Sequence, residues 1–432
     1  MAKRHSDQLG NLESLFLRLE ELVLANSGED EFEEIFKLLI AKLWDERSGK
    51  PPRFREWDSD AETFAQVSSL LREAGKGWPD VLVESESALV PEHLAVCVSV
   101  LARHRISDNG LEVLDGFFEF LVSKSAKGAK GQYFTPRYVV ELCVRMLRPT
   151  LADTVLDPAC GSAGFLIHTL NHVRRGGALG TEEALRKYCE TKIWGFDLDA
   201  RALRVGRALM VLAGDGSANL IRLNSLLRPN SLGLFGPTDD ESSLTIEDVC
   251  RSRLRHHKGF DVILTNPPFA GEVRERHLLD SYDFGKGRGR IERDVLFLER
   301  CVQLLRPRGR MAIVLPHNKY AGNAFAEERK WLFDKTRVLG VVGLGRNTFL
   351  PHTHQKASIL FVQKLDGGAR VKDDYDIFFA ISERDGKNSK GQPVVRTDGS
   401  EDDAWERVDH DFDEIVAAFH DFCGRHGVQF GE

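Results

Sequence analysis

Seven short apolar segments recur between residues 155 and 362, and this recurrence constrains the fold more than any other feature of the chain. Helical patterns separate the first six segments. A helix between successive strands requires a crossover, which makes those strands parallel. No helical pattern separates the last two, so we expect the seventh strand to be antiparallel. The sequence therefore predicts an α/β fold with a mostly parallel sheet whose strands are 155–157, 193–196, about 219–223, 260–264, 310–316, 338–342 and 357–362.

The regions outside the predicted sheet define the domain organisation. Residues 1–125 carry leucine and phenylalanine at helical spacing, which predicts an N-terminal helical domain. We assign the sheet domain to residues 126–368, after a small basic stretch. Residues 369–432 are polar and charged until about 402 and then show a weak helical pattern, so we expect a C-terminal tail with a short helix. The N-terminal helical patterns lie at 11–46, about 59–74, 91–103 and 107–123.

Composition restricts the setting of the protein. The chain has 432 residues, a formal net charge of -7 and seven cysteines that form no CxxC pair. Scattered cysteines favour a reducing cytoplasm and argue against a zinc site. His168 and His172 have helical spacing but no third ligand in view, so we predict no bound metal. No apolar run approaches a membrane span, and we expect a cytoplasmic protein without a membrane partner.

Residues 260–269 read Phe-Asp-Val-Ile-Leu-Thr-Asn-Pro-Pro-Phe and form the most informative local pattern. The strand should stop at Asn266-Pro267-Pro268, because proline cannot donate to a sheet and restricts the residue before it. Ligands of open α/β sheets bind at this edge. The Asn266 side-chain oxygen and the Pro267 carbonyl could accept both hydrogens of a conjugated amino group and stabilise its positive charge during attack on a methyl sulfonium. Phe269 offers a stacking face for a base swung out of a duplex.

Two further patterns suit a cofactor that carries an ammonium group. Residues 155–165 read as strand, glycine-rich turn and helix, and glycines let a ligand approach the backbone closely. Asp157 could hold an ammonium such as that of S-adenosylmethionine. Asp197 ends the second strand, where an acid is expected to bind ribose hydroxyls. Upstream, Thr135-Pro136 predicts a helix start with Thr135 as the cap.

The motifs occur in a characteristic order: Gly-Gln-Tyr-Phe-Thr-Pro, Asp-Pro-Ala-Cys-Gly-Ser-Ala-Gly-Phe, Gly-Phe-Asp-Leu-Asp and Thr-Asn-Pro-Pro-Phe. This set resembles the modification (M) subunit of type I restriction-modification systems, with the gamma arrangement of DNA adenine-N6 methyltransferases. The resemblance covers residues 105–365. It implies the seven-stranded sheet of S-adenosylmethionine-dependent methyltransferases, preceded by a helical domain. It also implies that the chain transfers a methyl group from S-adenosylmethionine to adenine N6 in DNA.

The resemblance implies roles for individual residues. Phe134 and Thr135 would contact the methionine end of the cofactor, and Asp157 would take its ammonium. Asn224 stands where the family usually has Asp, so we expect weaker binding of the cofactor adenine. The implied catalytic residues are Asn266, Pro267, Pro268 and Phe269. The implied cofactor-binding residues are Phe134, Thr135, Asp157, Ala159, Gly161, Gly164, Asp197, Leu198, Asn224 and Asn266.

The loop after the catalytic motif carries Lys286, Arg288 and Arg290 between glycines, and we predict that these cations contact DNA phosphates. Reading several base pairs requires a sizeable element in the major groove. The loop and the acidic or weakly helical tail are too small for that role. By elimination, double-stranded DNA should be read by a separate specificity subunit. The resemblance implies a second copy of this chain and a restriction subunit in the same assembly.

Two other functions are also compatible with the sequence. Glutamine-N5 methylation of a protein also uses Asn-Pro-Pro-aromatic, but commonly with tyrosine and without the upstream Phe-Thr-Pro. A non-catalytic methyltransferase-fold module of a DNA-defence complex is the other possibility, and the departure at Asn224 is its only support.

Overall fold

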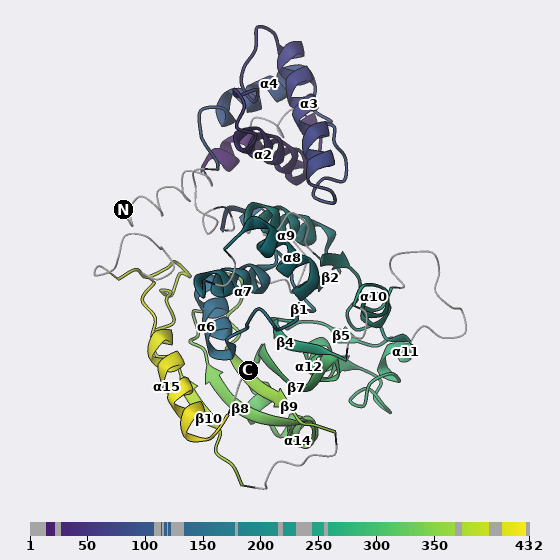
Figure 1. The fold of residues 1–432 in the computed structure, drawn as a ribbon, viewed down its shortest axis with the longest axis vertical. Helices are drawn as coiled ribbons and strands as arrows, with labels where there is room; N and C mark the ends of the chain where they lie inside the picture. The colour runs from purple at the N-terminus through teal and green to yellow at the C-terminus, as the bar shows by residue number, and fades with distance from the viewer. Residues whose placement is uncertain are drawn as a thin grey trace. The chain divides into compact units, whose positions relative to one another are not determined.

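The computed structural model divides into two compact units (Figure 1). Met1–Ala129 and Arg204–Ser217 form the helical unit, and Lys130–Leu203 and Ala218–Glu432 form the sheet unit. The predicted domain boundaries at residues 125 and 368 stay predictions, because contacts define units and not independently folding domains. The structure describes residues 14–21, 27–107, 114, 116–118, 120–121, 134–177, 180–214, 219–229, 244–254, 258–367, 374–396 and 408–428.

The helical unit contains the helices expected from the N-terminal leucine and phenylalanine pattern. The Asp30 side chain caps the first of them by accepting from the Glu33 amide, and Ser59 caps the next through the Glu62 amide. The pattern at 107–123 lies largely outside the described residues. The bounds are α2 (Glu31–Arg47), α3 (Asp60–Gly77) and α4 (Pro91–Leu101).

The helix α9 (Ala200–Leu212) contributes its second half to the helical unit. Arg204 is nearly buried and forms a two-pronged ion pair with Glu33 of α2. Arg47 donates to the carbonyls of Val211 (3.3 Å) and Leu212 (3.1 Å) at the end of α9, where the Val211 carbonyl also accepts the Gly214 amide (3.1 Å). Residues distant in sequence thus complete this unit.

The sheet unit is built on eight strands in the order β10-β8-β9-β7-β4-β1-β2-β3. Neighbouring strands are parallel except that β9 runs antiparallel to both β7 and β8. The seven predicted strands are confirmed, including the antiparallel direction of the seventh. The bounds are β1 (Val155–Asp157), β2 (Ile193–Asp197), β3 (Asn219–Arg222), β4 (Phe260–Thr265), β7 (Leu305–Pro316), β8 (Thr336–Gly343), β9 (Ala357–Lys364) and β10 (Phe378–Ile381).

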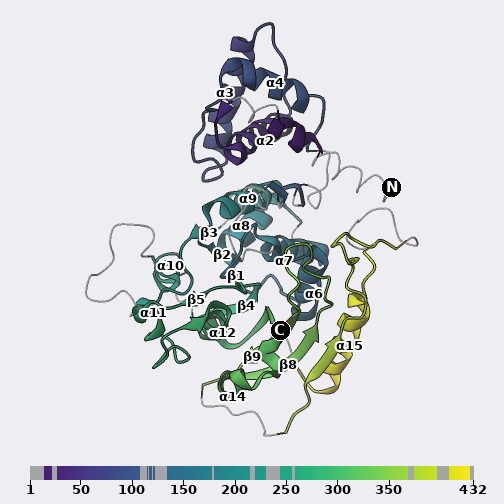
Figure 2. The same cartoon turned by 180° about the vertical axis from the view of Figure 1, so that it is seen from behind.

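The predicted sheet of seven strands was one strand short, because β10 forms in the polar C-terminal region. Figure 1 shows the helix α15 (Phe412–Arg425) alongside β10, and Figure 2 shows the same helix from behind. Phe378 of β10 contacts Phe419 of α15 at 5.4 Å between ring centroids, whereas the adjacent Phe379 is 71% exposed. A short edge strand needs apolar partners on one face only, so its sequence resembles a loop. The C-terminal region is therefore part of the sheet unit.

Helices cover both faces of the sheet. Along β9, Leu360 and Val362 join an apolar cluster with α10, α12 and α14, whereas Phe361 contacts Phe419 of α15. This alternation is the two-residue period of a strand buried on both sides. The remaining elements are α6 (Arg137–Leu147), α7 (Gly164–Arg175), α8 (Glu182–Lys192), α10 (Ile246–Arg253), β5 (Glu272–Val273), α11 (Arg276–Leu279), β6 (Ile291–Glu292), α12 (Arg293–Leu304), α13 (Asn318–Ala321), a 3-10 helix (Asn323–Phe325) and α14 (Ala326–Lys335).

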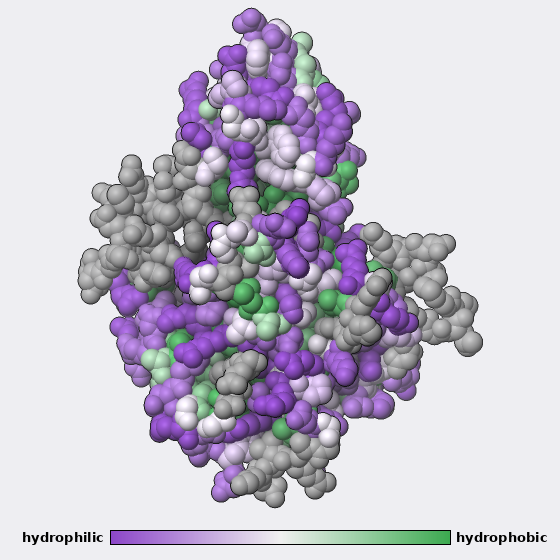
Figure 3. Space-filling model, in the orientation of Figure 1, coloured by the Kyte–Doolittle hydropathy of each residue, from purple (hydrophilic) through white to green (hydrophobic). Residues whose placement is uncertain are grey.

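Apolar side chains are concentrated inside the units. On the face drawn in Figure 3, hydrophilic residues predominate and hydrophobic residues form only small patches between them. Across the part of the chain that the structure describes, no helix has the length and apolar character needed to cross a membrane.

Candidate active site

A cleft of about 540 Å³ lies at the carboxyl ends of β1, β2, β3 and β4. Its volume is in the range of about 300–1,000 Å³ that is typical of small-molecule sites. The strand ends form one side, and the segment from β5 to α12 forms the other. The predicted site residues that line this cleft are Phe134, Ala159, Gly161, Asp197, Leu198, Asn224, Asn266, Pro267 and Pro268.

Asn266 has one satisfied and one unsatisfied polar atom. Its Nδ2 donates to the hydroxyl of Thr135 at 2.9 Å. Its Oδ1 is buried and accepts no hydrogen bond from any residue that the structure describes. An unpaired buried acceptor costs about 1–3 kcal/mol, so a ligand that donates a hydrogen bond to it would recover that cost. The cleft thus presents an acceptor held ready for a ligand N–H group.

Thr135 does not cap the helix that follows it, so that prediction was wrong. Pro136 is the N-cap residue of α6 and makes no side-chain capping bond. The Thr135 hydroxyl instead fixes the Asn266 amide, and the Thr135 side chain is buried outside the cleft lining. The Phe-Thr-Pro motif therefore supports a residue 131 positions away. Nothing in the sequence around Thr135 or Asn266 predicts this hydrogen bond.

Asp157 lies beneath the glycine-rich turn and is only 1% exposed. Its Oδ1 accepts the Ala159 amide at 3.0 Å, which shapes the turn. Burial raises the pKa of Asp157 to about 7, although hydrogen bonding to the carboxylate opposes this shift. The carboxyl group is not part of the cleft lining, so its predicted contact with a cofactor ammonium stays a prediction.

The two glycines of the turn, Gly161 and Gly164, lie in different surroundings. Gly161 lines the cleft with φ +50°, a left-handed conformation that favours glycine. Gly164 does not line the cleft. A Cβ atom there would lie 1.4 Å from a guanidinium nitrogen of Arg137, which also donates to Ser162 at 3.2 Å. The guanidinium of Arg137 thus occupies the space beside Gly164, and the predicted role of Gly164 in the approach of a cofactor stays a prediction.

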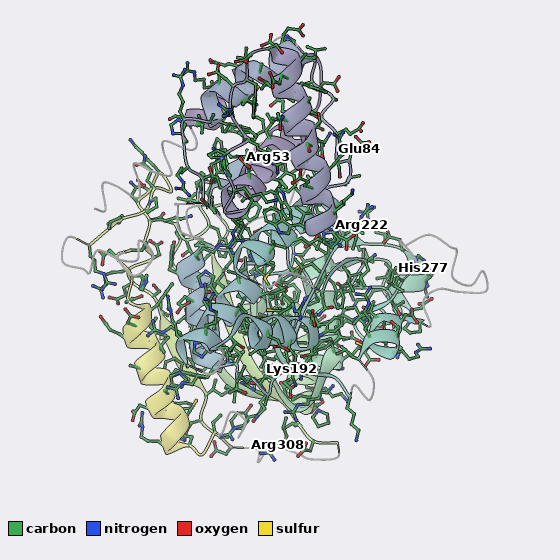
Figure 4. The ribbon with its side chains drawn as sticks, turned by 45° about the horizontal axis from the view of Figure 1, so that its top comes forward. Arg53, Glu84, Lys192, Arg222, His277 and Arg308 are labelled. Carbon is green, nitrogen blue, oxygen red and sulfur yellow. The ribbon has the colours of Figure 1, made fainter. Side chains whose placement is uncertain are left out.

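Asp197 ends β2 as predicted and organises the cleft. Its two carboxylate oxygens accept the amides of Gly161 (2.8 Å) and Asp199 (2.9 Å). Burial raises its pKa. Arg222, labelled in Figure 4, donates from Nε to the carbonyl of Leu198 at 3.2 Å and so fixes the exposed Leu198 beside the cleft. The carboxylate has more lone pairs than these backbone bonds use, so it can also accept from a ligand hydroxyl.

Asn224 follows β3 and lines the cleft. Its Oδ1 accepts the Leu226 amide at 3.1 Å, a turn role that sequence reasoning missed. An amide oxygen has two lone pairs, so this bond leaves room for a second donor. The same atom can therefore shape the loop and contact a ligand.

Phe269 stands apart from the other residues of the catalytic motif. It is 9% exposed and packs edge to face against Phe349, with ring centroids 5.7 Å apart. It does not line the cleft, whereas Pro267 and Pro268 do. The stacking role expected for Phe269 gains no support from this arrangement.

The predicted DNA-contacting cations each have a carboxylate partner. Lys286 pairs with Asp283 at 2.8 Å and Arg290 with Glu272 at 3.0 Å, and both cations are about two-thirds exposed at 65% and 66%. Arg288 is more buried and pairs with Glu328 of α14 at 2.7 Å. Since Glu328 is only 2% exposed, Arg288 neutralises an internal charge. Lys286 and Arg290 remain better candidates for phosphate contact.

Sequence reasoning missed the second wall of the cleft. The residues that line it are Glu272 of β5, Glu275 at the N-cap of α11, and Arg293 and Phe297 of α12. They occur in a segment without a recognisable motif, and only the fold brings them to the strand ends.

His168 pairs with Glu141 at 3.0 Å, and no cluster of three metal-binding side chains occurs within the described ranges.

The sequence of this chain is similar to sequences of known proteins. A family model described as N-6 DNA Methylase matches residues 110–403. The EcoEI type I restriction enzyme methylase subunit of Escherichia coli is 29% identical over 252 residues, which cover 58% of this chain and 46% of that protein. The EcoKI methylase subunit of Escherichia coli strain K12 is 26% identical, with coverage of 57% and 43%. This chain thus spans about half the length of these curated relatives.

A solved structure shares the fold across both chains. It is the methyltransferase subunit of a type I restriction-modification system from Streptococcus thermophilus, with a TM-score of 0.58. The match covers 98% of this chain and 93% of that one at 17% sequence identity. Identity at this level shows a common fold.

Proposed function

Because this chain belongs to the N-6 DNA methylase family, we propose that it transfers a methyl group from S-adenosylmethionine to N6 of adenine in DNA. The buried, unpaired Oδ1 of Asn266 at the cleft carries the proposal. An exocyclic amine is the donor that this acceptor lacks. The curated relatives are methylase subunits of type I restriction enzymes, which supports the same reaction.

The cleft residues fit S-adenosylmethionine. When bound, this cofactor would supply a methyl group activated by a sulfonium. Asp197 would accept the ribose hydroxyls through its remaining lone pairs, and Asn224 would accept from the adenine amino group. Leu198 and Leu226 offer apolar surface for the purine ring, and Phe134 stands at the Asn266 end for the methionine part.

Asn266 and Pro267 would act on the target amine. The Asn266 Oδ1 and the Pro267 carbonyl would accept its two hydrogens, which moves the nitrogen lone pair out of conjugation. The Thr135 hydroxyl holds the amide so that no reorganisation is needed as positive charge develops. When bound, the cofactor would give its methyl group to this nitrogen as the carbon–sulfur bond breaks and the neutral thioether leaves, and one amino hydrogen would leave as a proton.

A methyl-transfer assay separates this function from the two alternatives. The chain and its specificity subunit would be incubated with labelled S-adenosylmethionine, DNA and total protein. We expect label in N6-methyldeoxyadenosine after DNA digestion. Label in protein glutamine would favour the N5 reaction, and cofactor binding without transfer would favour a non-catalytic module.

We further infer that a separate subunit reads the DNA sequence, since the relatives are themselves subunits of type I restriction enzymes. A second copy of this chain and a restriction subunit would complete a cytoplasmic assembly. The chain alone should then bind cofactor and show little preference among random duplexes. Strongly sequence-selective methylation by the isolated chain would contradict this inference.

The double variant Lys286→Ala and Arg290→Ala should weaken DNA binding by the assembled enzyme at every sequence. Both cations are exposed, and the loss of about two phosphate contacts should lower the salt slope of log K by about 2. Arg288 stays intact because it neutralises the buried Glu328. Binding titrations at several salt concentrations measure this. A loss confined to one DNA sequence would show base contact instead.

Cofactor affinity should rise with pH if Asp157 holds the cofactor ammonium as a carboxylate. Its pKa is raised to about 7, so the folded protein prefers the protonated form below that pH. Below the pKa, affinity should fall by up to about tenfold per pH unit, because binding must first remove the proton. Calorimetry between pH 5.5 and 8.5 (about the span that brackets this pKa) measures it. An equal slope in Asp157→Asn would assign the dependence to another group, such as Asp197.

A further inference from the structure

The helix α12 carries a buried arginine whose hydrogen bonds all lead away from the helix. Arg300 is 1% exposed. Its Nε donates to the Ser225 carbonyl at 2.8 Å and its Nη2 to the Leu227 carbonyl at 3.2 Å. Its two terminal nitrogens also pair with the Glu247 carboxylate of α10 at 2.6 and 2.8 Å. A buried guanidinium is tolerated when such partners satisfy it.

The carbonyls that Arg300 holds belong to the loop after β3. Residues 224–226 of this loop line the cleft. The Tyr282 hydroxyl donates to the carbonyl between them, that of Leu226, at 2.7 Å. Three consecutive carbonyls, those of 225, 226 and 227, therefore accept from side chains outside the loop. Side chains of α12 and of the segment before β6 thus set the shape of this loop.

A fourth bond ties the same loop to the glycine-rich turn. The Ser225 hydroxyl donates to the Pro158 carbonyl at 2.6 Å, and both residues line the cleft. A shift of the loop would therefore move the turn after β1 as well. The two backbone segments expected to enclose the cofactor are fixed relative to each other through residue 225.

We propose that Arg300 is a positioning residue for cofactor binding, with Glu247 orienting its guanidinium. The proposal rests on S-adenosylmethionine as the cofactor. Arg300 does not line the cleft and acts by holding the loop on which Asn224 stands. Lysine at this position would keep the charge but lose the fork that reaches two carbonyls and a carboxylate together.

The test compares Arg300→Lys with Arg310→Lys. Arg310 is a matched control, since it is 2% exposed and its fork donates to the carbonyls of Leu147 (2.7 Å) and Arg148 (2.9 Å) and to the carboxylate of Asp153 (2.9 Å). Arg310 belongs to β7, its partner Asp153 precedes the amino end of β1, and Arg310 does not line the cleft. Both variants should unfold at lower temperature. Only Arg300→Lys should weaken S-adenosylmethionine binding, by about tenfold.

Calorimetry would be done on the full chain at a temperature where circular dichroism shows both variants folded. In the assembled enzyme, Arg300→Lys should raise the cofactor KM and leave kcat near normal, a split that lost stability alone does not produce. If Arg300→Lys does not fold, Glu247→Gln takes its place, with an expected loss of about threefold in affinity because the guanidinium is held less firmly.

Three outcomes decide the matter. Weaker cofactor binding in Arg300→Lys or Glu247→Gln, but not in Arg310→Lys, supports the proposal. Equal cofactor binding in these variants and the Arg310→Lys control overturns it, while binding by the wild-type chain keeps the proposed function intact. Absence of S-adenosylmethionine binding by the wild-type chain overturns the proposed function and this proposal together.

Discussion

Asn266→Ala is expected to lower the rate of methyl transfer at saturating cofactor by about 100-fold or more, the scale on which loss of a preorganised transition-state partner acts. Cofactor affinity should change by less than about twofold, because Oδ1 pairs with the target amine and matters mainly in the transition state. Single-turnover assays measure the rate and calorimetry measures the affinity. A variant that retains near-normal activity would rule out the mechanism.

Thr135→Val should have the same kind of effect as Asn266→Ala, but a smaller one. Valine keeps the shape of threonine and removes only the hydroxyl that accepts Asn266 Nδ2 at 2.9 Å. The Asn266 amide would keep its oxygen but lose its fixed orientation. We therefore expect the rate of methyl transfer to fall by about tenfold, which corresponds to the free energy of one hydrogen bond to a polar partner. A larger loss than in Asn266→Ala would mean that Thr135 has a role beyond orientation.

The sequence predicted the central sheet because its strands are buried on both faces and therefore read as continuous apolar runs. β4 and β9 are examples, with nearly every residue buried. The edge strand β10 escaped prediction because burial there alternates, and only Phe378 and Ala380 could face a helix. The apolar residues of a segment indicate how much of it is buried, and an edge strand buries few of its residues.

The site was predictable where one residue type has one chemical use at a strand end. Asn266 and Asp197 meet this condition, and both line the cleft. Roles that depend on a distant partner were not predictable. The guanidinium of Arg137 lies against Gly164, and Arg288 neutralises Glu328. Such pairings arise from tertiary packing, and spacing along the chain carries no record of them.

Substitution of Asp197 tests the part of the cleft that is expected to bind the cofactor. Asp197→Ala should weaken cofactor binding by about 100-fold or more, because it removes two charged acceptors that are each worth about 1.5–3 kcal/mol. It also leaves the amides of Gly161 and Asp199 without their partner.

Asn224→Asp should bind cofactor equally or more tightly, since an acid keeps the oxygen that accepts the Leu226 amide and adds a second acceptor oxygen.

Asp199→Asn is the control that separates ribose binding from the negative charge of the cleft. Asp199 lines the same rim, and its Oδ1 caps α9 by accepting the amides of Arg201 (2.8 Å) and Ala202 (3.0 Å). Asparagine keeps that oxygen and removes the charge, so affinity should change by less than about twofold. Calorimetry on all three variants gives the comparison. If Asp199→Asn weakened binding as much as Asp197→Ala, general attraction of a cationic cofactor would explain both, and the assignment of Asp197 to the ribose would fail.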